Sequence, residues 1–453
     1  MFKLSEKGHT YAMFAIAVLA CALGSLTQTV MNPMLDGVQA DFGVDASVSQ
    51  WLTTIYMLVL GITVPAVTFL AQKMCTRSLM ALSLGLFIAG SLVSFVSDSF
   101  AVLVAGRVLQ AVAAGITLPL VQSVAMTRFP PGQNGTAMGI AGIAMGFAPN
   151  IGPLIGGSLV DTWGWRSFFI ILVGILVVLV LANMAFVKRE DARNSSARLE
   201  TVSFLLSTLG FGGLLLAFSN AASLSFASPL VWAPAIVGAV CLVLFVRRQK
   251  RLETPLISMR IFSSAHYRVS FIAQNCLFAS FMGITLIVPL CVQGPMGLSP
   301  FEAGLVFVPA TIFAIIVNPI AGILSDKVGA RPVVIAASIL LTVGAVSMAF
   351  VDASTPLWLL TLMQTIRGLG VSALIGPLNS WGMAGLPHDV MMDASAFFAA
   401  VRQSCASFGT ALMVLIITVV SAATPGILGY QLAFGLSALF SACVFVLAVW
   451  KVR

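Results

Sequence analysis

The chain has 453 residues, of which 59% are hydrophobic and only 8% are charged, and its formal net charge is +8. A soluble domain carries roughly 25% charged residues, so the composition excludes a water-exposed globular surface and makes lipid the solvent of this fold. A nucleic-acid-binding protein is excluded as well, because the basic residues form short clusters between apolar runs rather than one patch.

Apolar runs of about 20 residues, the length that crosses a hydrocarbon core about 30 Å thick, recur along the chain. Irregular backbone is too costly in lipid, so each run is predicted to be a helix. We expect about fourteen such helices, which makes the fold class an all-α polytopic membrane protein. The expected spans are approximately 10–31, 48–71, 78–97, 100–127, 135–159, 165–187, 202–222, 229–246, 267–292, 300–324, 332–350, 356–383, 393–420 and 427–449.

The loops between these runs alternate in charge. One set holds basic clusters, such as Lys73 with Arg77 and Lys327 with Arg331, and both ends of the chain belong to it. The other set holds acids, such as Asp36, and almost no Lys or Arg. Because cytoplasmic loops carry the excess of Lys and Arg, both termini are predicted to be cytoplasmic, as an even number of helices also requires.

The two most basic loops flank residues 202–246, which predicts two helices inserted between two halves. The predicted domains are a six-helix bundle at 1–190, the inserted helices with their basic loops at 191–260, and a second six-helix bundle at 261–453. The halves echo one another, since Arg107 with Pro119 in the first resembles Arg367 with Pro377 in the second. Parallel repeats of six helices are the architecture of one large class of transporters.

Several segments resemble motifs of one transporter family. Residues 322–331 read GILSDKVGAR, which resembles the short cytoplasmic-loop signature of the major facilitator superfamily, and residues 146–157 are similar to the Gly-Pro "antiporter" motif of its drug exporters. Arg107 to Gln110 is similar to the motif of its fourth helix. Residues 51–56 and 255–262 are similar to segments of its fourteen-spanning drug:proton antiporter branch. The resemblance covers nearly the whole chain and implies a major facilitator fold, in the cell membrane, that exports drug-like compounds by alternating access.

The resemblance also implies gating roles for two segments. A helix rich in Gly and Ala lets a neighbouring backbone approach closely, and a proline within it permits a bend. Asp326, in a tight loop, can cap a helix start and pair with Arg331 or Lys327, which would hold the cytoplasmic side closed. Ordinary close packing and a solvated turn are the alternatives. The predicted gating residues are Gly146, Pro149, Gly152, Pro153, Gly156, Gly157, Gly322, Asp326, Gly329 and Arg331.

Two departures from the family pattern bear on mechanism. Gln72 stands where the matching loop of the first half has Asp in the family, and Thr27 stands where this branch usually has Asp. A proton antiporter needs a titratable group in the transport path, and the sequence places no Asp, Glu or His deep within an expected span. The embedded charges are instead Arg107, Arg367 and Arg402, which stay protonated and favour an anionic or neutral solute. Protons are a candidate coupling ion without an evident carrier.

The binding cavity of such a fold is expected near the midplane, between the halves. Its candidates are polar residues in apolar helices, with Arg107 foremost, and for each of them an interhelical hydrogen bond is an equal alternative. The predicted substrate-binding residues are Gln28, Asn32, Arg107, Gln110, Gln274, Asn275, Gln364, Arg367 and Arg402. Gln122, Asn150, Asn318, Asn379 and Gln403 are further candidates.

Three functions remain open. The first is a secondary exporter of amphipathic or drug-like compounds, which the motifs favour. The second is a transporter of organic anions by facilitated diffusion or exchange, which the embedded arginines favour, and the third is a transport-dead membrane sensor. No enzyme is expected, because no nucleophile–base pair, phosphate loop or metal cluster is visible. We expect a monomer that binds a small molecule and lipid, with no cofactor, metal or nucleic acid.

Overall fold

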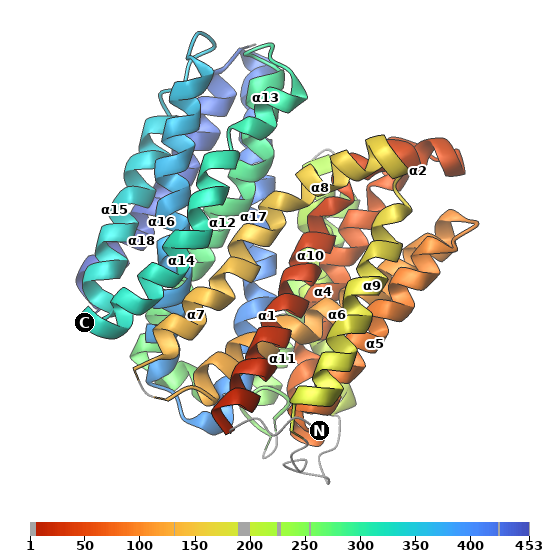
Figure 1. Ribbon diagram of the computed structural model, residues 1–453. Coiled ribbons are helices and arrows are strands. Elements are labelled where there is room, and N and C mark those ends of the chain that lie inside the picture. The colour runs from red at the N-terminus through yellow and green to blue at the C-terminus, as the bar shows by residue number, and fades with distance from the viewer. Residues whose placement is uncertain are drawn as a thin grey trace.

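A computed structural model of the chain describes residues 6–130, 132–188, 200–223, 228–252, 255–424 and 426–452. In these residues the chain folds into long helices joined by short loops. Figure 1 shows two bundles that meet at the end where α1 begins and diverge toward the other end. The predicted class, an all-α polytopic membrane protein, is confirmed.

The N-terminal bundle carries most of its length in helices that run from one end of the molecule to the other. They are α1 (Glu6–Val30), α4 (Trp51–Lys73), α5 (Thr76–Phe95), α6 (Phe100–Thr127), α7 (Asn134–Gly142), η2 (Ile143–Phe147), α8 (Ala148–Trp163) and α9 (Ser167–Phe186). Three short elements, η1 (Asn32–Met34), α2 (Leu35–Phe42) and α3 (Ala46–Ser49), connect α1 to α4.

The inserted pair and the C-terminal bundle follow in chain order. The pair is α10 (Thr201–Ser223) and α11 (Pro229–Gln249), and η3 (Met259–Ser263) lies after it. The bundle consists of α12 (Ala265–Gln293), α13 (Pro300–Leu305), α14 (Val308–Val328), α15 (Ala330–Met348), α16 (Leu357–Ala384), η4 (His388–Val390), α17 (Met391–Ala423) and α18 (Leu428–Lys451). The predicted domain boundary at residue 190 lies outside the described residues, and the one at residue 260 falls within η3.

Within the described residues, twelve helices are long and apolar enough to cross a membrane. A bent pair within α4, Trp51–Thr63 and Ala66–Lys73, would make a thirteenth span. The remaining expected span, 135–159, coincides with α7, η2 and α8, where a π-helical stretch at Ile143–Phe147 interrupts the α-helix. Every expected apolar run therefore falls on a helix or on an interrupted helix.

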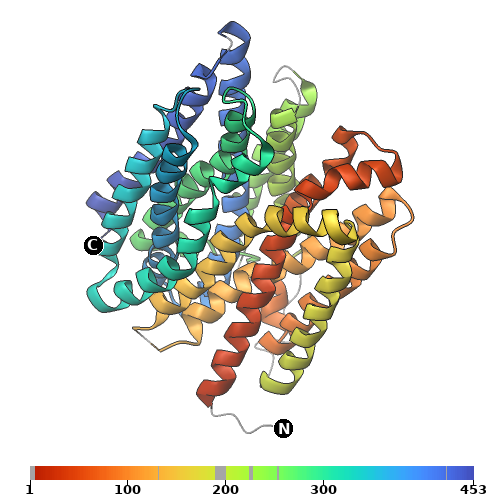
Figure 2. The ribbon, with the colours of Figure 1, turned by 45° about the horizontal axis from the view of Figure 1, so that its top comes forward.

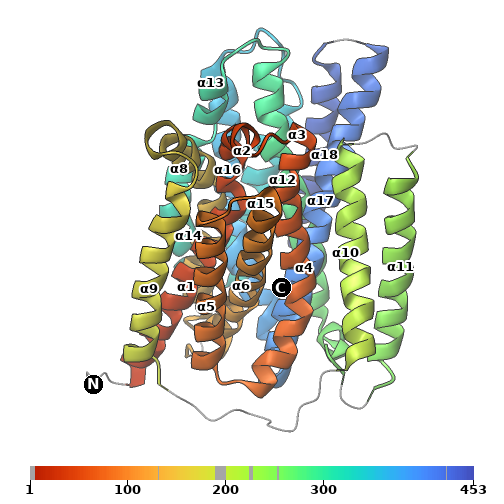
Figure 3. The same ribbon diagram turned by 90° about the vertical axis from the view of Figure 1, so that its right-hand side faces the viewer.

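The inserted pair lies beside the seam between the bundles. Helix α10 packs against both α4 and α17, while α11 lies on its outer side (Figure 3). At the end of the pair, Arg248 donates to both carboxylate oxygens of Glu200, at 2.7 Å and 3.2 Å. These hydrogen bonds from Arg248 hold the pKa of Glu200 at about 2, so this clasp between α10 and α11 stays charged over the physiological range.

The bundles approach each other most closely where α7 crosses α14. Figure 2 shows the run of α7 and α8 crossing between the red α1 and the teal C-terminal bundle. A Cβ added to Gly322 of α14 would lie 2.3 Å from the carbonyl oxygen of Gly135, and one added to Gly139 of α7 would lie 2.5 Å from that of Asn318. Only glycine permits these two backbones to come so close. Helix α8, by contrast, packs on α1 and α9 of its own bundle.

We expect Gly322→Ala to destabilise the protein by about 1–3 kcal/mol, because the added methyl group would overlap the backbone of Gly135 and push the bundles apart. Thermal unfolding followed by intrinsic fluorescence would measure the loss. Gly174→Ala in α9 is the matched control, since a Cβ there meets nothing within 4 Å. Equal unfolding temperatures for the two variants would contradict a tight backbone contact at Gly322.

Candidate functional site

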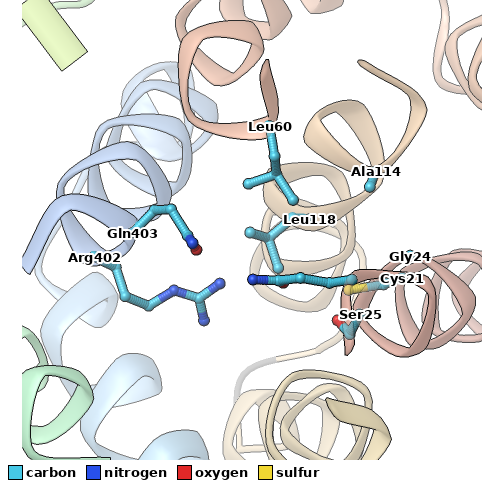
Figure 4. Close-up of a pocket in the computed structure, with 9 residues that line it drawn as sticks. Cys21, Gly24, Ser25, Leu60, Ala114, Leu118, Arg402 and Gln403 are labelled. Carbon is cyan, nitrogen blue, oxygen red and sulfur yellow. The ribbon is translucent and has the colours of Figure 1, made fainter. Parts of the chain in front are cut away.

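A small cavity of about 20 Å³ lies between the two bundles. Figure 4 shows Arg402 and Gln403 pointing from α17 toward Leu118 and toward the small residues of α1. The pocket is lined by Cys21, Gly24, Ser25, Gln28, Leu60, Ala114, Leu118, Arg402 and Gln403. Helices α1, α4 and α6 thus supply one wall and α17 supplies the other, so both bundles contribute to a single site.

Arg402 is the charged group of this pocket and is 8% exposed. Its guanidinium carbon lies 4.4 Å from the ring centre of Phe278, and its Nη1 lies 3.7 Å from the Sδ of Met145. In the part of the chain that the structure describes, Arg402 forms no salt bridge. A cation–π contact is worth about 0.5–2 kcal/mol, which is less than the cost of an unpaired charge at membrane depth. An acceptor or anion in the pocket would therefore meet a cation that the protein leaves largely uncompensated.

Arg107 does not reach the pocket, because its side chain is fully buried inside the N-terminal bundle. It donates to the carbonyl oxygens of Leu52 and Thr27, at 3.4 Å and 3.1 Å, and to Oε1 of Gln110, at 3.0 Å. The guanidinium also lies 4.4 Å from the ring centre of Tyr56. Arg107 thus ties α1, α4 and α6 together, which is the structural alternative that its sequence pattern left open.

Arg367 occupies the matching interior of the C-terminal bundle. Its Nη2 donates to the carbonyl oxygen of Ser280 at 3.0 Å and to the hydroxyl of Ser280 at 3.2 Å. Its Nε and Nη1 have no hydrogen-bond partner among the described residues, and the side chain is fully buried. A Cβ on Gly344 would lie 2.7 Å from the Cβ of Arg367, so α15 closes over this residue. Arg107 and Arg367 are therefore similar in being buried inside their own bundles, and both lie outside the pocket.

The other predicted binding residues lie partly in the pocket and partly in the bundle interiors. Gln28, Arg402 and the further candidate Gln403 line the pocket. Asn32 is exposed and accepts a hydrogen bond from Thr53. The rest are buried within their own bundles. Gln110 donates to Ser91, Gln274 donates to Ser270 and Asn275 donates to the carbonyl of Phe271, while Oε1 of Gln364 has no partner in the described part of the chain.

The sequence did not predict the wall of the pocket that small residues of α1 form. Cys21, Gly24, Ser25 and Gln28 recur at spacings of three and four residues, so they share one face of α1. That periodicity of small and polar residues was a usable signal. It was hidden because cysteine, glycine and serine are also the usual residues of close helix packing.

A second feature joins the bundles at one end. The carboxylate of Asp326, at the end of α14, accepts hydrogen bonds from the backbone N–H groups of Gly135 and Thr136, at 2.8 Å and 2.7 Å, and from the hydroxyl of Thr136, at 2.6 Å. These groups form the first turn of α7, where the helix dipole favours an anion. We call these contacts the Asp326 latch. The expected ion pairs of Asp326 with Lys327 or Arg331 are not formed.

The predicted gating glycines fall in two places. Gly322 lies in the seam between the bundles, against Gly135, and a Cβ on Gly146 would lie 3.2 Å from Ile375 of α16. Gly152 and Gly156 instead pack against α1 within their own bundle, where the carbonyl of Pro149 also accepts a hydrogen bond from Thr29. A Cβ on Gly157 or Gly329 would meet no described atom within 4 Å, and Arg331 is exposed. The side chain of Pro153 lies outside what the structure describes.

One buried carboxylate escaped the sequence analysis. Asp393, in the first turn of α17, is 7% exposed and accepts a hydrogen bond from the N–H of Ser258 at 2.8 Å. It opens an expected span rather than lying deep within it, and so it looked like a loop residue. As for a metal, no three His, Cys, Asp or Glu side chains in the described ranges lie close enough together to hold one.

The chain matches the model of the Major Facilitator Superfamily over residues 17–410 and again over residues 270–453. The chain belongs to the major facilitator superfamily. Among its relatives it is 34% identical over 394 residues to YcnB, an uncharacterized MFS-type transporter of Bacillus subtilis, covering 87% of this chain and 83% of that protein. It is 30% identical over 413 residues to the lincomycin resistance protein LmrB of Listeria monocytogenes, covering 91% of this chain and 88% of that protein.

A third relative is similar in sequence, and a solved structure is similar in fold. The multidrug export protein EmrB of Haemophilus influenzae is 28% identical over 418 residues, which is 90% of this chain and 80% of that protein. The crystal structure of the transporter FucP in the outward conformation superposes with a TM-score of 0.64, at 14% identity, over 97% of this chain and 98% of that one. The major facilitator fold implied by the motifs is thereby confirmed.

We expect Arg107→Gln to lower the stability of the folded transporter by about 3 kcal/mol, since it leaves the carbonyls of Leu52 and Thr27 without their charged donor. Thermal unfolding in a fixed detergent would measure this loss. Arg402→Gln is the control, because Arg402 makes only soft contacts and its loss should shift the unfolding temperature much less. A larger loss for Arg402→Gln than for Arg107→Gln would reverse the two roles assigned here.

Proposed function

We propose that this protein is a secondary exporter of amphipathic, drug-like compounds, which it binds in the pocket at Arg402 and moves by alternating access. The observation that carries the proposal is a pocket that both bundles line, at a place where a rocking motion would open it to either side. Its relatives include a lincomycin resistance protein and a multidrug export protein, which supports export of such compounds. We expect it to act as a monomer in the cell membrane.

The Asp326 latch supports a closed cytoplasmic end. It lies beside Lys327, in the set of basic loops that we expect to be cytoplasmic from the distribution of charge. With both termini on that side, the bundles meet at the cytoplasmic end and diverge toward the outside (Figure 1). The structure would then represent the outward-facing state, and export would require the latch to open.

A second candidate function, transport of organic anions, is favoured by Arg402 alone. Its charge is uncompensated in a pocket whose other polar groups are the amides of Gln28 and Gln403 and the hydroxyl of Ser25. A guanidinium recognises a carboxylate through paired hydrogen bonds, whereas it repels a cation. The two candidates differ in the charge of the solute, and so the same assay separates them.

We expect Arg402→Gln to weaken binding of an organic anion by about tenfold or more, because a charge-assisted hydrogen bond is lost. Uptake of a fluorescent organic anion, a fluorescent amphipathic cation and lincomycin into proteoliposomes, with and without a pH gradient, would measure transport. Arg402→Lys keeps the charge and should restore part of the affinity.

The results discriminate between the proposals. Transport of the cation and lincomycin with no effect of Arg402→Gln would support drug export and contradict an anion site. Transport of the anion alone, insensitive to the pH gradient, would favour the second candidate. No transport of any member of a broad panel, by a folded protein, would contradict both.

We also expect Asp326→Asn to shift the protein toward a state open at the latch, because the neutral amide is a weaker acceptor at the start of α7. Spin labels at Gln133 and Lys327, both exposed, would report the separation of the bundles at this end in a cysteine-free background. A longer distance should gain population in Asp326→Asn. Asp352→Asn, which changes an exposed acid in another loop, is the control. An identical shift in that variant would contradict a role of Asp326 in holding this end closed.

A further inference from the structure

Three consecutive residues of the loop after the inserted pair are held by side chains from three different helices. Thr68 of α4 donates to the carbonyl of Leu256 at 2.8 Å, and the N–H of Ile257 donates to Oε1 of Gln249 of α11 at 3.1 Å. The N–H of Ser258 donates to Asp393 of α17 at 2.8 Å. We call Leu256–Ser258 the strap.

The strap is built into the protein interior. Leu256 is 5% exposed and Ile257 is fully buried. Gln249 is itself fixed by a hydrogen bond from its amide to the hydroxyl of Ser203 in α10, at 2.6 Å. The strap therefore connects α4 of the N-terminal bundle to α17 of the C-terminal bundle through a path that also includes the inserted pair, and the two bundles cannot separate here while it is bound.

The strap lies between the end of α4 and the start of α17, which is the place that corresponds to the Asp326 latch in the other half of the molecule. Asp326 binds the start of α7 across the seam, and Gln72 occupies the equivalent place in the last turn of α4. Thr68 lies one helical turn before Gln72 on α4. At the start of α17 the polarity is reversed, because the helix supplies the carboxylate of Asp393 and the loop supplies the N–H donor.

We propose that the strap is the second closure of the transporter, that it replaces the latch which Gln72 cannot form, and that charged Asp393 is its anchor. Uptake of a proton by Asp393 removes the ionic acceptor of the Ser258 N–H and leaves a neutral carboxyl group, so the strap is released as the pH falls. Asp393 is thus a positioning residue that makes opening sensitive to protons, independently of which solute is carried.

The surroundings of Asp393 support this assignment. Its one hydrogen-bond donor among the described residues is the N–H of Ser258, and no salt bridge neutralises it there. The titratable groups that act on it are Asp389 of η4 and the hydroxyl of Tyr267 of α12, which itself donates to the carbonyl of Ala394. Arg260 of η3 lies 3.6 Å from Asp389, at the exposed rim, and not against Asp393. A carboxylate buried without a cation is costly in its charged form, so a proton has a favourable place to bind.

Hydrogen–deuterium exchange of the full chain in lipid nanodiscs tests the proposal, read on peptides that cover the strap and corrected for the intrinsic effect of pH. In the wild type, protection of the strap should fall by about tenfold as the pH is lowered from about 8.5 to about 5.5. Asp393→Asn should show the low protection at every pH, whereas Asp393→Glu should keep a pH dependence. The pH profile of transport should flatten in Asp393→Asn.

Two further variants keep the test decisive. Asp389→Asn removes an exposed negative charge four residues away, so it should keep the pH dependence of strap protection and move its midpoint only slightly, toward lower pH. Thr68→Val should lower protection at all pH values but keep the pH dependence, since it removes only the contact to Leu256. A flat profile in the wild type would overturn the proposal even if Asp393→Asn failed to fold. Wild-type protection and pH dependence in Asp393→Asn would overturn it as well.

Discussion

The cost of a charge or an unpaired polar group in hydrocarbon organises this structure. The three membrane-embedded arginines differ in how many partners offset that cost. Among the described residues, Arg107 has three acceptors, Arg367 has one partner residue and two nitrogens without a partner, and Arg402 has only two phenylalanine rings and a sulfur atom. Water cannot complete a missing contact inside a bundle. The number of hydrogen-bond partners therefore distinguishes a structural arginine from one in a binding site. The arginine that the protein satisfies best fixes the helices, and the one that it satisfies least faces the pocket, where a ligand or solvent can complete it.

At the closed end, too, polar groups that lack a partner in their own element are paired across the seam. Helix starts offer N–H donors that the helix itself cannot satisfy, and at the start of α7 Asp326 accepts two of them from across the seam. Glycine makes the contact possible, because a side chain on Gly322 or Gly135 would hold the backbones apart. At the start of α17, the acid is on the helix and the donor is on the strap. Both contacts are polar and few in number, so they close this end without making it permanently rigid, which a carrier that opens here requires.

Hydropathy and charge predicted the helices, the inserted pair and the class of fold, because lipid imposes length and apolarity on every span. They could not predict which arginine would reach the pocket. Arg107, Arg367 and Arg402 are equally embedded in sequence, and their fates depend on the rotation of each helix, which packing decides. Gly90 of α5 shows how: a Cβ there would lie 2.7 Å from the carbonyl of Gly106, so that face of α6 turns toward α5. Asp393 was missed for a related reason, since hydropathy places it at a boundary and only the fold shows the strap that buries it.

Helix α17 connects these features. Asp393 precedes Arg402 by nine residues, a rise of about 13 Å along one helix, and Arg402 forms the C-terminal wall of the pocket. The same helix packs against α4, α6 and α10, so it touches the N-terminal bundle and the inserted pair as well as its own bundle. A solute that drew Arg402 toward α1 would have to move or tilt α17, and any such movement would act on the strap that Asp393 anchors. In this arrangement the inserted pair has a role in the transporter. The loop that follows it supplies the N–H of Ser258, and this contact with Asp393 couples a movement of α17 to the closed end.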